Sequence, residues 1–205
     1  MSGSCDMAKH TMKRARNKKK VIGETDMWYV IQTFGGEEEQ TADIIKKRVS
    51  SYYIEDCFIP KRERMKKFQG RWNKVEEILF RGYVFVVSQR PEELYQSLQR
   101  IPKLTKILGR EENYFVPLNE EERKMVQRIG DKEHRTGISK IELKEGKIVR
   151  VIDGPLTEYV GNVVKLNLHK REVTVKVTFM GRDVELKIGV EMVEDKEKEA
   201  RGNKR

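Results

Sequence analysis

Residues 172–180 alternate between apolar and polar side chains, and no other part of the sequence constrains the fold as strongly. A period of two predicts a β-strand with one buried and one solvated face. The segments 147–152, 160–168 and 184–188 are also strand-like and show no helical period. Four or five short antiparallel strands in about fifty residues can hardly bury a core as a flat sheet, so we expect a small closed or half-closed barrel. The apolar positions are Val173, Val175, Val177 and Phe179, and the polar ones are Thr174, Lys176 and Thr178.

The N-terminal half mixes strands and helices. Residues 28–34 have apolar side chains at both odd and even positions, as in a strand whose two faces are covered. Gly35 and Gly36 end this predicted strand. The order βαββαβα, with several strands joined by short connections, predicts an α+β fold. Further strands are expected at 54–59, 78–87 and near 106–108, and helices at 37–49, from Pro91 to Pro102 and after a capping Asn119.

Changes in composition predict five segments along the chain. Two tails are basic, and a polar stretch without periodicity separates the two folded parts. The predicted segments are a disordered basic arm (1–26), an N-terminal domain (27–131), a linker (132–143), a C-terminal barrel domain (144–195) and a basic tail (196–205).

A basic stretch at residues 61–74 is the strongest signal for nucleic acid. The chain has a net charge of +10, but the tails 1–26 and 196–205 contribute +4 and +3 of it. Within the folded part, residues 61–74 concentrate a charge of +6, with Phe68 and Trp72 among the cations. This combination suits phosphates with bases to stack on. We therefore predict that a loop or hairpin binds nucleic acid through Lys61, Arg62, Arg64, Lys66, Lys67, Arg71 and Lys74.

A second group of cations lies in the predicted barrel. Alternation places Lys165 and Lys176 on the wet face of neighbouring strands, with Lys170 and Arg171 at the turn between them. These four cations, and Arg182 in the next turn, could bridge phosphates of an RNA stem or reach a loop base.

The sequence offers no catalytic or metal-binding pattern. Its histidines (His10, His134 and His169) lack cysteine or carboxylate partners at metal spacing. Cys5 and Cys57 form no disulfide framework, and no membrane span or secretory signal is predicted. We therefore expect a cytoplasmic, monomeric binding protein that is not an enzyme and has no cofactor or metal.

Three motifs together resemble the NusG family of transcription elongation factors. They are residues 28–30 (Trp-Tyr-Val), residues 80–86 (Phe-Arg-Gly-Tyr-Val-Phe-Val), and residues 147–156 followed by Gly161. The resemblance covers about residues 27–195. It implies an N-terminal domain with a four-stranded antiparallel sheet and flanking helices, joined flexibly to a small C-terminal β-barrel, the KOW domain.

The resemblance also implies partners. The N-terminal domain would dock on the RNA polymerase clamp through Trp28, Phe80 and Tyr83, facing upstream DNA and the non-template strand. An aromatic residue in a strand is more often core, so at least one of the three is expected to be buried. Arg81 stands where many relatives have proline.

In housekeeping members the KOW loops bind a small-subunit ribosomal protein or a termination factor. The matching positions are Leu156, Tyr159, Phe179 and Met180, and Leu156 and Met180 replace aromatic residues common in those members.

The basic segment and tails make the chain most similar to the specialised LoaP-type antiterminators. That resemblance implies recognition of an RNA hairpin in the leader of a target operon, followed by processive antitermination. Two alternatives remain: a housekeeping NusG-type elongation and pausing factor, and a ribosome-associated KOW protein that binds RNA.

Overall fold

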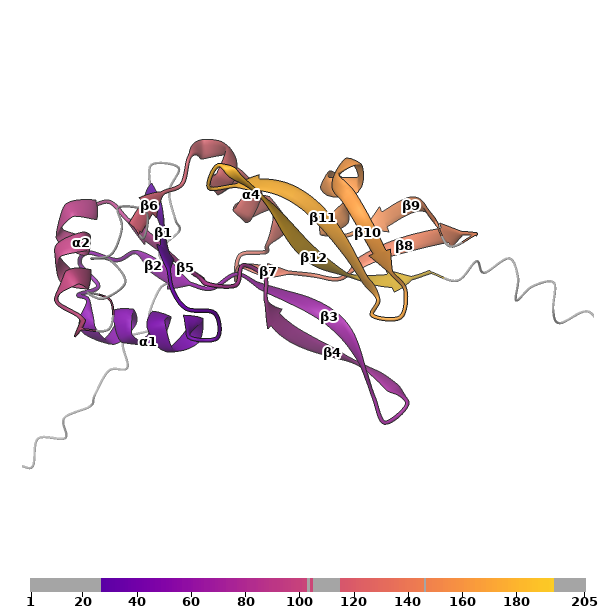
Figure 1. The fold of residues 1–205 in the computed structure, drawn as a ribbon, viewed down its shortest axis with the longest axis horizontal. Helices are drawn as coiled ribbons and strands as arrows, with labels where there is room; N and C mark the ends of the chain where they lie inside the picture. Colours follow the sequence, from indigo (N-terminus) through magenta and orange to yellow (C-terminus); the bar gives the residue numbers. More distant parts are fainter. Residues whose placement is uncertain (1–26, 103, 105–114, 146, 194–205) are drawn as a thin grey trace, which may run out of the picture.

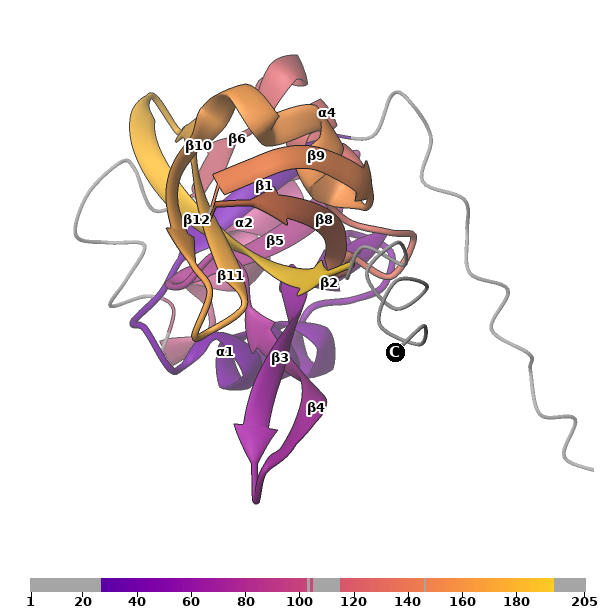
Figure 2. The ribbon, with the colours of Figure 1, turned by 90° about the vertical axis from the view of Figure 1, so that its right-hand side faces the viewer.

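The computed structural model describes residues 27–102, 104, 115–145 and 147–193. It contains a mixed N-terminal half, a strand-rich C-terminal half and a long β-hairpin arm that projects from the body (Figures 1 and 2). The expected basic arm at 1–26, the tail at 196–205 and the short strand near 106–108 lie outside the described residues.

The N-terminal sheet has four antiparallel strands in the order β2-β5-β1-β6. In the two central strands, β5 and β1, the side chains on both faces are mostly apolar, since both faces of the sheet are covered. Ile31, Val84 and Val86 pack with residues of α1 and α2, while Trp28 and Phe85 belong to a second cluster that continues into the C-terminal half. The strands are β1 (Met27–Gln32), β2 (Asp56–Phe58), β5 (Tyr83–Ser88) and β6 (Phe115–Pro117).

The helices match the sequence signals. The helix α1 buries Ala42 and Ile45, and Asn119 caps α4 in a reciprocal capping box with Glu122. Their bounds are Glu38–Arg48 for α1, Pro91–Gln99 for α2 and Glu120–Ile129 for α4.

The expectation of one strand over residues 78–87 is wrong. The chain turns at residues 79–82, and the second strand, β5, begins only at Tyr83. Gly82 has a φ of +80°, and a Cβ there would lie 3.3 Å from the carbonyl oxygen of Thr33. Hydrophobicity alone could not reveal this turn, because its apolar residues Leu79 and Phe80 are themselves buried.

The basic segment forms the arm. Strands β3 (Lys61–Phe68) and β4 (Arg71–Ile78) pair along their whole length, and β3 also pairs in parallel with the short strand β7 (Arg135–Thr136). The arm extends away from both halves of the molecule (Figures 1 and 2).

The C-terminal half is a curled five-stranded sheet in the order β10-β11-β12-β8-β9. Its pairs are antiparallel except for β12 with β8, which is parallel. The elements are β8 (Ser139–Lys144), β9 (Lys147–Asp153), the 3-10 helix η2 (Pro155–Asn162), β10 (Val163–Asn167), β11 (Glu172–Phe179) and β12 (Arg182–Met192).

The stretch 132–143, expected as a structureless linker, contains β7 and most of β8. Each of these strands pairs with a strand distant in sequence, β3 and β12 respectively. Polar composition concealed both strands because the partners that stabilise them lie far away along the chain. No helix in the described ranges is long and apolar enough to cross a membrane.

Candidate nucleic-acid interface

The base of the arm holds a cluster of charged side chains in which Arg62 and Glu172 are buried and Arg64 and Glu77 are partly buried. Arg62 Nη2 lies 2.6 Å from Glu77 Oε2 and 2.8 Å from Glu172 Oε1. Arg64 Nε lies 2.7 Å from Glu77 Oε1, and its Nη1 lies 3.4 Å from Glu172. Glu172 begins β11, so these ion pairs join the arm to the C-terminal sheet. Arg62 and Arg64, predicted to contact nucleic acid, instead hold two parts of the protein together.

The electrostatics of Glu77 reflect this cluster. Burial opposes ionisation of its carboxyl, but the guanidinium groups of Arg62 and Arg64 outweigh burial and lower the pKa of Glu77. The carboxylate is therefore stabilised in its charged form by the arginines that it binds.

A cation–π contact joins the two basic hairpins. The guanidinium carbon of Arg171, in the β10–β11 turn, lies 4.2 Å from the centre of the Trp72 ring in β4. The backbone holds Arg171 at a φ of +50°, and its carbonyl accepts a hydrogen bond from Val190 N at 2.8 Å. The two cationic segments, about a hundred residues apart in the chain, therefore lie side by side.

Four further predicted cations are also engaged within the protein. Lys61 pairs with Glu39 at 2.9 Å, Lys74 with Glu63 at 3.3 Å and Lys176 with Asp183 at 2.7 Å. Arg182 donates a hydrogen bond to the hydroxyl of Tyr83. Hydrogen bonding to Asp183 raises the pKa of Lys176.

The remaining predicted cations are exposed. They have no ion pair among the residues that the structure describes, so their charge is available to a ligand. We call these five residues the two-hairpin surface: Lys66, Lys67, Arg71, Lys165 and Lys170.

The three aromatic residues expected to dock on polymerase are all buried, whereas one buried residue was the minimum expected. Trp28 is 2% exposed and packs edge-on against Phe58 and His134 of its own half. Phe80 is 2% exposed and Tyr83 is 8% exposed, and both rings contact Phe179 of the C-terminal half. In this arrangement Phe80 and Tyr83 form part of the contact between the halves.

The expected partner loop of the C-terminal domain is covered as well. Leu156, Tyr159 and Phe179 are buried. Met180 N donates a 2.5 Å hydrogen bond to Glu122 of α4, and the Tyr159 hydroxyl lies 3.4 Å from Met125 O. Burial raises the pKa of Tyr159.

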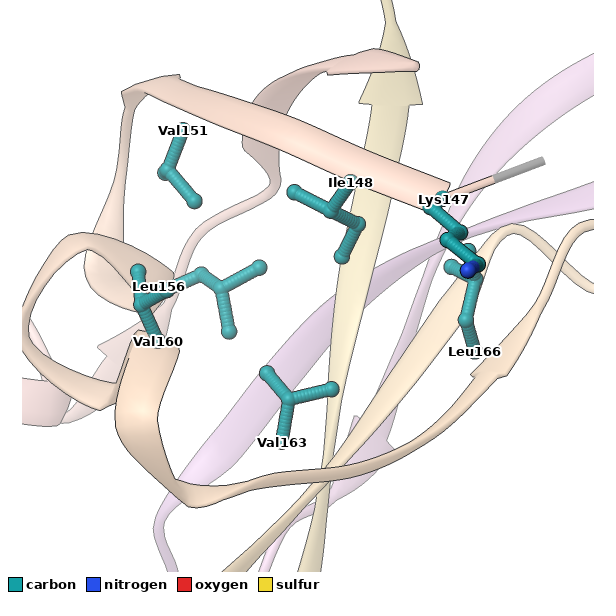
Figure 3. Close-up of a pocket in the computed structure, with 7 residues that line it drawn as sticks. All are labelled: Lys147, Ile148, Val151, Leu156, Val160, Val163 and Leu166. Atoms are coloured by element: carbon teal, nitrogen blue, oxygen red, sulfur yellow. The ribbon is translucent and has the colours of Figure 1, made fainter. Parts of the chain in front are cut away.

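A cavity of about 290 Å³ lies on the open side of the C-terminal sheet, between β9 and β10. Figure 3 shows apolar side chains from β9, η2 and β10 around it, with Lys147 at its edge. Apart from Lys147, the lining is entirely apolar: Ile148, Val151, Leu156, Val160, Val163 and Leu166. Across the described ranges, no cluster of three or more metal-ligating side chains is present.

Sequence reasoning missed the residues that join the two halves. Glu77, Glu122, Glu172 and Gly189 have ordinary surface-type identities. Gly189 lies so close to β3 that a Cβ would be 2.4 Å from Glu63 O. The sequence signal that hints at internal pairing is the pair of glutamates just after the basic segment, Glu76 and Glu77.

Comparison with known proteins supports the sequence motifs. A family model described as "Transcription termination factor nusG" matches residues 26–127. The chain is 26% identical over 175 residues to the "Transcription termination/antitermination protein NusG" of Buchnera aphidicola, covering 82% of this chain and 94% of the relative. The chain is therefore similar to NusG proteins, by the family model over residues 26–127 and by the relative over most of its length.

A second relative and one solved structure are also similar to this chain. The NusG protein of Vibrio cholerae is 27% identical over 168 residues, covering 79% of this chain and 92% of that protein. A solved structure described as "Domain interaction in Thermotoga maritima NusG" aligns with 80% of this chain and 93% of its own, at 27% identity and a TM-score of 0.49. The predicted α+β fold class with a NusG-like N-terminal domain is confirmed, and the curled C-terminal sheet is consistent with the predicted small KOW barrel.

Proposed function

We propose that this protein is a transcription elongation and antitermination factor that docks on RNA polymerase and binds structured RNA on its two-hairpin surface. The observation that carries the proposal is the contact between Arg171 and Trp72, which brings two separate cationic hairpins together. The relatives named as termination/antitermination proteins support the role in transcription.

The surface suits an RNA stem. Exposed lysine and arginine side chains on two adjacent hairpins can contact phosphates on both sides of a stem, and such contacts supply affinity without reading sequence. The buried ion pairs of Arg62 and Arg64 with Glu172 support a fixed spacing between the hairpins. A fixed spacing favours one stem geometry over others, which is how a leader hairpin would be selected.

Polymerase docking through the family's aromatic positions has a structural requirement. Phe179 covers Phe80 and Tyr83, so docking through them requires the two halves to separate. An aspartate at Tyr83 would be buried beside Phe179, so that substitution tests packing and is unsuitable as a docking test.

The test is a charge reversal that leaves the buried cluster intact. In the double variant Lys67→Glu, Lys170→Glu, both positions are exposed, so we expect normal unfolding and at least about tenfold weaker binding to an RNA stem-loop from the gene's own leader. The dependence of affinity on salt should also become shallower, by about one in slope for each phosphate that the variant no longer binds. Fluorescence anisotropy measures both.

The control is Arg100→Glu, an exposed residue directly after α2, and Figure 1 shows α2 well away from the tip of the arm. It should bind RNA as the unmodified chain does. Equal affinity of the unmodified chain for any RNA, lost on adding salt, would favour a housekeeping factor. Binding to ribosomal RNA with no binding to purified polymerase would favour the ribosome-associated alternative.

A further inference from the structure

The tip of the arm presents one aromatic ring to solvent. Phe68 is 64% exposed and lies directly opposite Arg71 across a two-residue turn. Both turn residues have positive φ, +48° for Gln69 and +81° for Gly70, as in the tight hairpin turns that suit the twist of paired strands. Phe68 is therefore the last residue of β3 before the turn of a regular hairpin, and this turn is the outermost part of the arm (Figures 1 and 2).

The other aromatic residue of the basic segment has a different environment. Trp72 is partly buried, and the Arg171 guanidinium lies over its ring. Because that contact anchors the arm, it also fixes the direction in which the tip points. Of the two aromatic side chains that could stack on a base, Phe68 is the one whose ring is left open.

The charges around Phe68 select its ligand. Lys66, Lys67 and Arg71 surround the ring in sequence or across the hairpin, and none has an ion pair among the described residues. A dry apolar protein surface would have to bury these charges without partners, which is costly. An unpaired nucleotide offers a flat base for the ring and flanking phosphates for the cations. A base inside a duplex is already stacked on its neighbours and leaves no face for a single ring.

We propose that Phe68 stacks on an unpaired nucleobase while Lys66 and Arg71 contact the phosphates on either side of it. This inference rests on the proposed nucleic-acid binding of the two-hairpin surface and adds a contact to unpaired bases, such as those in the loop of a hairpin. RNA loops and single-stranded DNA both offer unpaired bases and phosphates. Binding to RNA and DNA probes therefore decides which nucleic acid supplies the base.

The experiment uses the full chain and three probes: an RNA stem-loop with an unpaired loop, the same stem as a continuous duplex, and the stem-loop made of DNA. Phe68→Leu keeps an apolar side chain and removes the ring. We expect on the order of tenfold weaker binding to the stem-loop and unchanged binding to the duplex. A fluorescent adenine analogue in the loop should be quenched by the unmodified chain and not by Phe68→Leu.

The matched control is Phe34→Leu, because Phe34 is a 61% exposed phenylalanine in the loop after β1. It should leave binding to all three probes unchanged. A Phe68→Leu chain that binds the stem-loop as tightly as before, or whose affinity falls equally for stem-loop and duplex, overturns the inference but leaves the proposed function standing.

An unmodified chain that binds none of the probes overturns both proposals. A tenfold effect confined to the RNA loop identifies RNA as the source of the base. The same effect confined to the DNA loop identifies single-stranded DNA.

Discussion

The base and the tip of the β3–β4 arm both carry cationic side chains, but they place them in different environments. At the base, Arg62 is 5% exposed and shares two glutamates with Arg64. At the tip, Lys66, Lys67 and Arg71 are exposed. A buried cation must be paired to offset its lost hydration, whereas an exposed cation keeps its hydration and can exchange it for a ligand. The depth of burial, and not the residue type, separates the cations that are paired within the protein from those that remain available to a ligand.

The largest expected effect lies at the base. In Arg62→Ala, Glu77 and Glu172 lose a shared partner in a buried site, so we expect the free energy of unfolding to fall by about 3 kcal/mol. Urea denaturation measures it. Lys66→Ala, at the tip of the same strand, should change this free energy by less than about 0.5 kcal/mol. Similar losses in the two variants would erase the distinction between base and tip.

The close approach of β12 to the base gives a smaller effect. Gly189→Ala would place a Cβ 2.4 Å from Glu63 O and 3.0 Å from Arg64 Cα, both backbone atoms, so the strands must move apart. We expect a loss of about 1–3 kcal/mol in the free energy of unfolding. Gly137→Ala is the matched control, because nothing lies within 4 Å of its Cβ position. If both alanine variants unfold alike, β12 does not hold the arm.

The smallest effect concerns pH. The pKa of Glu77 is lowered below its ordinary value of 4.5, since burial is outweighed by Arg62 and Arg64. A carboxyl with a lowered folded-state pKa contributes stability that is fully present above pH 4.5 and is lost as pH falls through that lower pKa. Thermal unfolding below pH 4.5 should therefore depend less steeply on pH in Glu77→Gln than in the unmodified chain. The exposed carboxyl of Glu121 provides a control, and an equal change in Glu121→Gln would contradict the assignment.

Local patterns predicted the elements whose causes are local. The strand predicted at residues 28–34 is observed as β1, and the helix predicted after Asn119 is observed as α4. The alternating residues 173–179 lie in β11. Each depends on neighbours within a few positions, through backbone periodicity or a reciprocal cap. The strands β7 and β8 were missed because their pairing partners lie far along the chain.

The sequence by itself determined that this protein has two basic segments within an α+β fold. The tertiary structure decided which cations on those segments are free to bind. Arg62 and Glu172 are 110 positions apart, and no sequence period connects them. Charge in a sequence is a local property, but its availability depends on burial and on partners that only the folded chain brings together.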